Sequence, residues 1–260
     1  MLGHVPLSLS LVGLGSTTES AGARRLIEHA AKLGPRAIRL DASLAGLRAR
    51  DLDRSARRDL ASLLRRLGVG FGGIDLWIPP EHFADPSRSE RAVDAVRSAI
   101  DLCAELASLD GRPAGRTLSI TLGADSDAAA SEVSIAAARA TVRIVDHGPD
   151  AENRAGPDSP FSAGVDPASL LLRSLDPVQE VARLGNRVAS PRLSDTDGIS
   201  RVTPGHGRLD LLSYHASLIV SGVATDAVLD ARGLQSPDAQ LREAIDAWDH
   251  LGPGSAFGLT

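Results

Sequence analysis

Residues 191–210 read PRLSDTDGISRVTPGHGRLD, and this stretch carries more information about the fold than any other part of the chain. Residues 187–193 are apolar enough to form a buried strand, with Arg192 just inside its end and Asp195 just beyond it. A loop bracketed by Gly205 and Gly207 follows, and Asp210 ends it. In parallel α/β folds, the side chains that perform chemistry lie at such carboxyl ends of strands. The stretch therefore predicts that Arg192 and Asp195 form part of a functional site.

Short apolar runs alternate with stretches of helical spacing along the whole chain. The runs that we expect to be strands are 5–12, 37–40, 69–78, 117–122, 141–145, 161–165, 187–193 and 227–229. This alternation is typical of βα units on a parallel sheet. Eight such units fit an α/β (β/α)8 TIM barrel, although a doubly wound open sheet has the same local pattern. With no linker, repeat or low-complexity tract, residues 1–260 are expected to be a single domain.

The expected helices differ in how clearly they show an apolar face. The spacing of Val93, Val96, Ile100 and Cys103 predicts that Cys103 is a core residue, and a similar spacing ends the last helix at Trp248. Residues 147–160, HGPDAENRAGPDSP, have no apolar stripe, so the fifth helix is expected to be shortened or missing. Its loss would uncover apolar strand surface that a second subunit could cover, and a homo-oligomer is therefore one expectation.

Composition and charge argue against several classes of partner. The net charge of −5 and an aromatic content of 3% give neither a basic surface nor a stacking platform, so nucleic acid is not an expected partner. No apolar run reaches the length of about 18 residues that crosses a bilayer, and the apolar N-terminus alternates like a strand, so we expect no membrane partner. The lone cysteine fits a reducing compartment, and the expected location is cytoplasmic.

Familiar catalytic and cofactor motifs are missing from the sequence. The segment Gly13-Leu14-Gly15-Ser16-Thr17-Thr18 follows a strand and partly mimics a dinucleotide fingerprint, but the third glycine is absent. A simple turn between strand and helix is the better interpretation of it. The chain contains no Walker loop, no Gly-x-Ser-x-Gly elbow and no His-Glu-x-x-His. These absences argue against phosphate-loop enzymes, serine hydrolases of that type and zincins.

Ionisable residues stand at or near the ends of four expected strands. They are Asp146, Asp166, Arg192 with Asp195, and Asp230. A single aspartate in such a place often caps the helix that follows, and Asp166 before a proline fits that simpler interpretation. Three carboxylates together favour a site, because burying them is costly unless cations or donors accompany them. By alternation, His147 points away from its neighbour Asp146.

The order of these motifs resembles the xylose isomerase-like TIM barrels, a family that includes sugar phosphate isomerases and epimerases. Val165-Asp166-Pro167-Ala168-Ser169 is similar to the family's sixth-strand motif. Arg192-Leu193-Ser194-Asp195, followed by Pro204-Gly205-His206-Gly207-Arg208-Leu209-Asp210, is similar to its seventh-strand motif and loop. Ile74-Asp75-Leu76 leading into Pro80-Glu81-His82-Phe83 also resembles some members. The resemblance spans most of the chain and favours the barrel over the open sheet.

The chain departs from that family at most of the positions that hold its divalent metal (Mn, Mg, Zn or Co). Asp166 matches the family, while Asp146 and Asp230 each stand where it has Glu, Arg192 replaces a ligand His, and Ser169 replaces a second His. A guanidinium has no lone pair to give a metal and carries a fixed positive charge. We therefore expect no metal cofactor here. The hypothesis is that Arg192 stands in for the cation among three converging aspartates.

Two functions of different class remain open at this stage. The resemblance implies a sugar or sugar-phosphate isomerase or epimerase that abstracts a proton next to a carbonyl, whereas the substitutions favour a catalytically degenerate barrel that binds a small molecule or serves as a scaffold. Either would take a sugar or polyol ligand. The expected catalytic residues are Asp146, Asp230 and Arg192. The expected substrate-binding residues are Asp166, Asp195, His82, Arg201, His206 and Arg232.

Overall fold

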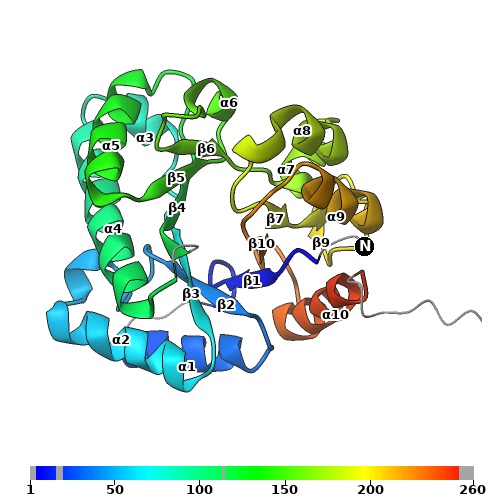
Figure 1. Ribbon diagram of the computed structural model, residues 1–260, viewed down its shortest axis with the longest axis horizontal. Coiled ribbons are helices and arrows are strands. Elements are labelled where there is room, and N and C mark those ends of the chain that lie inside the picture. The colour runs from blue at the N-terminus through cyan, green and yellow to red at the C-terminus, as the bar shows by residue number, and fades with distance from the viewer. Residues whose placement is uncertain (1–3, 16–19, 113–114, 252–260) are drawn as a thin grey trace, which may run out of the picture.

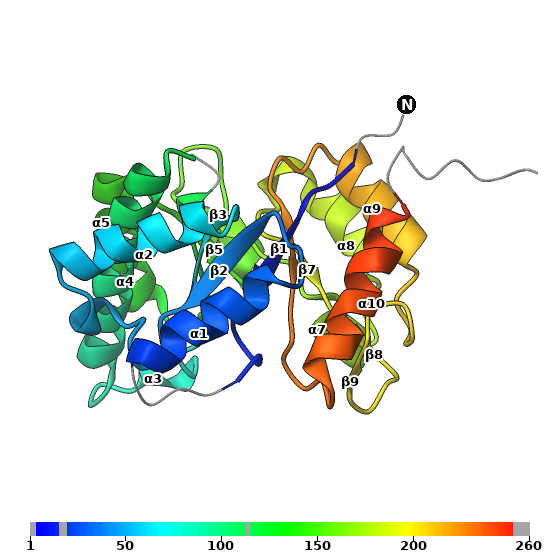
Figure 2. The same ribbon diagram turned by 90° about the horizontal axis from the view of Figure 1, so that it is seen from below.

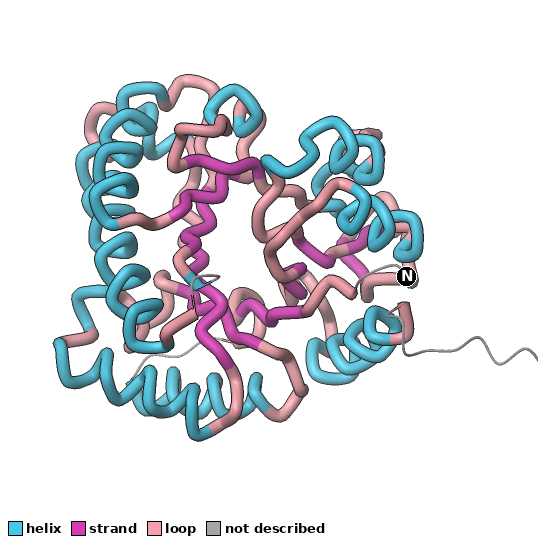
Figure 3. The backbone as a smooth tube through the Cα atoms, viewed as in Figure 1, coloured by secondary structure: helices cyan, strands magenta, loops and turns pink. Residues whose placement is uncertain are grey.

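Eight parallel strands form the centre of the molecule. The computed structural model describes residues 4–15, 20–112 and 115–251. The strands lie in the order β6-β5-β4-β3-β2-β1-β10-β7, with helices outside them (Figure 1, Figure 3). Their bounds are β1 Leu7–Ser10, β2 Ala37–Asp41, β3 Gly70–Asp75, β4 Thr117–Ile120, β5 Arg143–Asp146, β6 Phe161–Ala163, β7 Arg192–Leu193 and β10 Ala227–Leu229. All eight expected strands are present.

Hydrogen bonds between β6 and the segment before β7 close the sheet into a barrel. Ala163 pairs in parallel with Val188, and the Ala189 amide donates to the Ala163 carbonyl at 2.9 Å. The Arg192 amide donates to the Val165 carbonyl at 2.7 Å. These bonds join the two ends of the strand order, so the (β/α)8 TIM barrel is confirmed and the open sheet is excluded.

The helices form the outer layer of the barrel, and Figure 2 shows α1 and α10 on the outside of the strands around β1. Their apolar faces are buried against the strands, as amphipathic spacing requires. The α-helices among the described residues are α1 Ser20–Ala31, α2 Arg54–Arg66, α3 Glu81–Ala84, α4 Ser89–Asp110, α5 Asp127–Ala140, α6 Ala151–Arg154, α7 Pro167–Leu172, α8 Pro177–Leu184, α9 Leu211–Val220 and α10 Pro237–Asp249.

The two core residues singled out from their spacing are buried as expected. Cys103 is fully buried on α4, and burial raises the pKa of its thiol to about 12, so it is an inert core residue. Trp248 is also fully buried, and its Nε1 donates to the Val5 carbonyl at 2.9 Å, which attaches α10 to the start of β1. Among the described residues, no helix is both long and apolar enough to cross a membrane.

Two elements differ in length from a regular barrel. The fifth helix is reduced to the single turn α6, which confirms the expectation of a shortened helix. β7 is shorter than expected, because Gly185–Arg187 forms a 3-10 turn and Ser190 has a φ of 46° before Pro191. Beyond β7 the chain makes a small antiparallel ribbon of β8 (Asp195–Thr196) and β9 (Arg201–Val202). Ser16, Thr17 and Thr18 of the partial fingerprint lie outside the described residues.

Candidate functional site

A buried ion cluster, which we call the axis cluster, joins Arg39 of β2, Asp75 of β3 and Arg192 of β7. Arg192 binds Asp75 with two hydrogen bonds of 2.7 and 3.0 Å, and the Nε of Arg39 binds it at 2.9 Å. The hydroxyl of Ser10 donates to the same carboxylate at 2.6 Å. Burial alone would raise the pKa of Asp75, but the two guanidiniums hold it well below its usual range. Arg192 thus does bind a carboxylate bidentately, but its partner is Asp75 and not one of the three expected aspartates.

Trp77 lies beside the axis cluster and connects it to the strand ends. Its ring contacts two guanidiniums, with the Cζ atoms of Arg192 and Arg232 at 5.1 and 4.6 Å from the ring centroid. Both distances fall within the range of cation–π attraction. The His147 ring packs edge-on against the same indole at a centroid distance of 5.2 Å. Trp77, which follows β3, therefore contacts one residue from each of three other strand ends: His147 after β5, Arg192 in β7 and Arg232 after β10.

His147 is a neutral imidazole at this position. Its Nε2 lies 3.4 Å from the Ser119 hydroxyl, while its Nδ1 is buried with no partner among the described residues. Burial lowers the pKa of His147 well below 6.5, and the nearby charge of Arg192 lowers it further. In the tautomer whose Nε2 donates to Ser119, Nδ1 carries a free lone pair. That tautomer supplies an unprotonated base beside fixed positive charges.

Asp166 and Asp230 do converge, and two other arginines neutralise them. Nη2 of Arg201 donates to Oδ2 of Asp166. Nη2 of Arg232 donates to the same oxygen at 3.2 Å. Nε of Arg232 binds the two oxygens of Asp230 at 2.8 and 3.0 Å. Burial would raise the pKa of Asp166, but Arg201 and Arg232, with the hydroxyl of Ser194, hold it well below its usual range. Both carboxylates are therefore ion-paired.

Asp166 also caps the helix that follows it. Its Oδ1 accepts from the Ser169 amide at 3.5 Å, and its Oδ2 accepts from the Ser169 hydroxyl at 2.9 Å. Asp166 therefore caps α7 and also belongs to the group of charged side chains at the strand ends. Ser169 belongs to the site through this carboxylate.

Asp146 faces away from this group. Its Oδ1 accepts from the amides of Leu122 and Gly148, and its Oδ2 accepts from Arg154 of α6 at 2.8 Å. Asp146 and His147 point in opposite directions, as alternation predicted, and it is the histidine that reaches Trp77. The structure therefore does not bring Asp146 to Arg192, and the expected convergence of three aspartates on that arginine is wrong.

Asp195 anchors the glycine-bracketed loop. Its carboxylate is fully buried and accepts four backbone hydrogen bonds, from the amides of Thr196, Gly205, Gly207 and Leu209, at 2.7 to 3.0 Å. A Cβ on Gly207 would lie 2.5 Å from the Asp195 carboxylate, so only glycine permits this approach. The whole motif is explained by a loop that wraps one carboxylate. Each Asp195 oxygen already accepts two backbone hydrogen bonds, so neither is directed at a ligand.

The two expected histidines lie away from Trp77. His206 is exposed and pairs with Glu243 of α10 at 2.9 Å. The Nε2 of His82 lies 3.0 Å from Nη1 of Arg88, beside α4. The structure thus brings together Arg192, Arg201, Arg232, Asp166 and Asp230 of the expected site residues, and it leaves His82, His206, Asp146 and Asp195 elsewhere.

We call the group formed by Trp77, His147, Asp166, Arg192, Arg201, Asp230 and Arg232 the mouth cluster. The sequence pattern gave the direction of His147 correctly but did not indicate a place in the site for His147, Trp77, or Asp75 and Arg39 beneath them. One signal was available: Asp75 and Trp77 are two residues apart, so both side chains lie on one face if the strand geometry continues. Nothing local identifies the face of Arg39, because a register shift between Ile38 and Arg39 alters the pairing of β2 with β3.

The residues at the four metal-equivalent positions do not fit a divalent cation. Arg192 cannot ligate a metal, Asp146 is turned toward Arg154, and Asp166 and Asp230 are covered by guanidiniums. Among the residues that the structure describes, no group of three or more His, Cys, Asp or Glu side chains is placed to hold a metal ion.

Comparison with known proteins identifies the fold. No family model and no curated protein matches the sequence. Among solved structures, an L-ribulose 3-epimerase is similar with a TM-score of 0.74 and 17% identity over 96% of this chain and 94% of that one. A xylose isomerase-like TIM barrel protein from Mycobacterium smegmatis, in complex with magnesium, has a TM-score of 0.74 and 12% identity over 97% and 98%. The D-allulose 3-epimerase of Methylomonas sp., in complex with D-allulose, has a TM-score of 0.70 and 15% identity over 95% and 97%. The chain thus shares its (β/α)8 TIM barrel fold with these proteins.

Proposed function

We propose that this barrel is an isomerase- or epimerase-like protein that binds a sugar or polyol at the mouth cluster without a divalent metal. One observation carries the proposal: Nε1 of Trp77, Nε of Arg192 and Nη1 of Arg201 are buried with no hydrogen-bond partner among the described residues. A buried donor without an acceptor costs about 1–3 kcal/mol. Hydroxyl or carbonyl oxygens of a bound ligand would satisfy all three, which is why an oxygen-rich ligand suits this site.

The fold supports the same ligand class. One similar barrel has been solved with D-allulose, a ketose, and others are sugar epimerases. In this chain the positive charges at the mouth come from side chains, since Arg201 and Arg232 occupy the carboxylates that a cation would otherwise bind. Chelation is therefore expected to leave ligand binding intact.

Thermal unfolding with D-allulose, L-ribulose and sorbitol tests the proposal. At least one of these ligands is expected to raise the melting temperature equally in EDTA and in magnesium. Arg201→Gln removes an unpartnered donor, while Asp166 keeps its contact with Arg232, and should abolish the ligand-dependent shift. Arg58→Gln, which removes an exposed arginine from α2, is the matched control. A shift that requires magnesium, or near-stoichiometric metal in protein purified without chelator, would overturn the metal-free proposal.

A second candidate, proton abstraction next to a carbonyl, is favoured by the state of His147. Its free Nδ1 can take the proton from carbon as the bonding electron pair moves to the carbonyl oxygen and forms an enediolate. In this mechanism the donors on Arg192 and Trp77 that lack hydrogen-bond partners stabilise that oxygen. Return of the proton from His147 to the neighbouring carbon, as a hydroxyl proton passes between the two substrate oxygens, completes an isomerisation. His147 suits the role of base better than Asp146 or Asp230, because guanidiniums neutralise both carboxylates.

Deuterium incorporation separates the two candidates. Catalysis predicts wash-in from heavy water at the carbon next to the carbonyl of a bound ketose, followed by proton NMR. His147→Gln should abolish the wash-in and preserve the ligand-dependent melting shift. A wild-type protein that binds a ketose but shows no wash-in would eliminate catalysis on that ketose and leave the binding function standing.

A further inference from the structure

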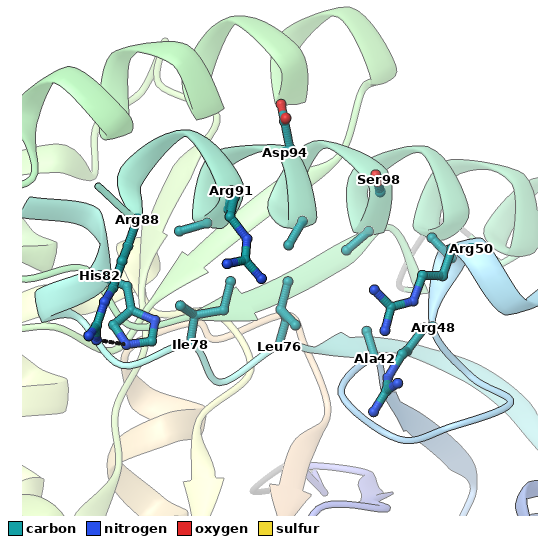
Figure 4. Close-up of a pocket in the computed structure, with 14 residues that line it drawn as sticks. Ala42, Arg48, Arg50, Leu76, Ile78, His82, Arg88, Arg91, Asp94 and Ser98 are labelled. Atoms are coloured by element: carbon teal, nitrogen blue, oxygen red, sulfur yellow. Dashed lines mark hydrogen bonds between the residues drawn. The ribbon is translucent and has the colours of Figure 1, made fainter. Parts of the chain in front are cut away.

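A cavity lies outside the barrel axis, between the ends of β2 and β3 and the first turns of α4. Its volume is about 620 Å³, which lies within the range of small-molecule sites. Leu76 and Ile78 form its floor, and Ala92, Ala95 and Ala99 of α4 form its wall. We call it the α4 groove (Figure 4).

The α4 groove is independent of the mouth cluster. Asp75 and Trp77 face the axis, whereas the intervening Leu76 and the following Ile78 line the groove. A strand-like segment presents alternate residues to opposite sides, so residues 75–78 separate the two sites. A ligand in the groove would lie behind Trp77 and not against the guanidiniums of the mouth.

Positive charge dominates the lining of the groove although the whole chain carries a net charge of −5. Figure 4 shows the Arg91 guanidinium reaching from α4 toward Leu76 and Ile78, with Arg48 and Arg50 at one end. The lining contains four arginines, Arg48, Arg50, Arg88 and Arg91, but only one acidic residue, Asp94. The Asp94 side chain points away from the groove and binds Arg97 at 3.2 Å.

The arginines of the groove differ in how far neighbouring acids neutralise them. Arg88 binds Asp85 at 3.3 Å. Nε of Arg48 donates to the Ser43 carbonyl at 2.9 Å, and the Asp41 carboxylate is close enough to attract the same guanidinium. Arg50 lies 3.8 Å from Asp51, a loose and exposed pair. The Arg91 side chain has no hydrogen bond or ion pair with any residue in the described ranges. Three guanidiniums thus retain donor capacity above an apolar floor.

We propose that the α4 groove binds a phosphate monoester whose organic body is apolar. The dianionic phosphate lies against Arg91 with Arg48 and Arg50, because the planar guanidinium matches phosphate oxygens with paired hydrogen bonds. The body lies on Leu76 and Ile78 and gains affinity from the apolar area that it covers. This site is additional to the sugar or polyol site at the mouth.

Isothermal titration calorimetry with octyl phosphate, below its micelle-forming concentration, tests the proposal. One molecule per chain is expected to bind. Inorganic phosphate, which lacks the apolar body, should bind at least about tenfold more weakly. 1-Octanol has the same chain without charge and without a sugar, and it should show no measurable binding. Equal affinity for octyl phosphate and 1-octanol would overturn the role of the arginines.

Two variants on the exposed surface of α4 identify the site. Arg91→Gln should weaken octyl phosphate binding by about tenfold, the effect of losing one charge-assisted contact. Ala95→Glu places a carboxylate in the groove and should abolish binding. Arg58→Gln on α2 and Ala128→Glu on α5 make the same charge changes elsewhere and should bind as the wild type does. Unchanged affinity in both α4 variants would refute the proposal, and Arg201→Gln, which tests the mouth, should leave this binding intact.

Discussion

At the scale of single residues, Asp75 is the most exacting position in the barrel. Its carboxylate is the counter-ion of two buried guanidiniums, Arg39 and Arg192, whose side chains are at most 1% exposed. Removing one partner of a buried ion pair is far more costly than removing an exposed one, because the charge left behind has no solvent. Asp75 of β3 thus links its own strand to β2 and β7, through arginines that lie 36 and 117 positions away in the sequence.

Asp75→Asn is accordingly expected to reduce the free energy of unfolding by about 3 kcal/mol or more, the typical cost of an uncompensated buried charge. Urea denaturation at pH 7 measures this loss. Asp59→Asn, an exposed position on α2, is the control and should change stability by less than about 0.5 kcal/mol. Comparable small losses in both variants would contradict the role assigned to the axis cluster.

The lowered pKa values of Asp75 and Asp166 make the fold sensitive to acid. A carboxyl whose pKa is lower in the folded state than in the unfolded state stabilises the fold above its unfolded pKa of about 4, and that contribution is lost as the pH falls toward the folded value. The free energy of unfolding should therefore fall steeply below about pH 4, and less steeply in Asp75→Asn. Parallel pH profiles for the two proteins would contradict this linkage.

At the scale of elements, the junction of β2 and β3 depends on glycine. Gly73 has a φ of 109°, and the pairing of the two strands shifts in register beside it. A Cβ there would lie 2.5 Å from the Thr117 carbonyl and 2.7 Å from Nη1 of Arg39. Nη1 of Arg39 occupies the space left by the missing side chain, and Nε of the same guanidinium binds Asp75. A glycine in the strand thus determines where a buried charge lies.

Gly73→Ala should therefore destabilise the protein by about 3 kcal/mol, combining backbone strain with displacement of Arg39. Gly68→Ala is a matched control, because Gly68 also has a positive φ, 73°, but has nothing within 4 Å of an added Cβ. Strain alone predicts a loss of about 1 kcal/mol there. Chemical denaturation of both variants separates the two causes, and equal losses would show that the close contact has no energetic consequence.

At the scale of the whole molecule, the contact between β6 and the segment before β7 is a weak seam of the barrel. β2 and β3 pair along five residues of β2, whereas β6 meets the segment before β7 through one bridge and two amide hydrogen bonds. Fewer backbone hydrogen bonds between two strands make local opening easier. The shortened α6 and the 3-10 turn before β7 both lie on this side of the barrel.

Hydrogen exchange followed by mass spectrometry should locate this seam. Peptides that cover residues 187–193 are expected to exchange about tenfold faster than peptides that cover 37–41, since opening between β6 and β7 breaks fewer bonds. The addition of a mouth ligand should slow exchange at the seam, because Arg192 lies on it. Equal protection of the two segments would contradict a preferred opening site.

The sequence by itself determined the architecture: eight strands in order, the shortened fifth helix, the core positions of Cys103 and Trp248, and acids and arginines at the strand ends. These follow from local periodicity and from composition, which are properties of short segments. The resemblance carried by residues 191–210 correctly favoured the barrel. Its glycines serve mainly to wrap the loop around Asp195.

Only the tertiary structure decided which arginine forms an ion pair with which aspartate. Arg192 was expected among three aspartates and instead binds Asp75, while Arg201 and Arg232 neutralise Asp166 and Asp230. The physical reason is parity: side chains alternate between the two faces of a strand, so a shift of one residue moves a side chain from the axis to the helix layer. Strand ends and register shifts set that parity, and they depend on contacts between segments far apart in the chain.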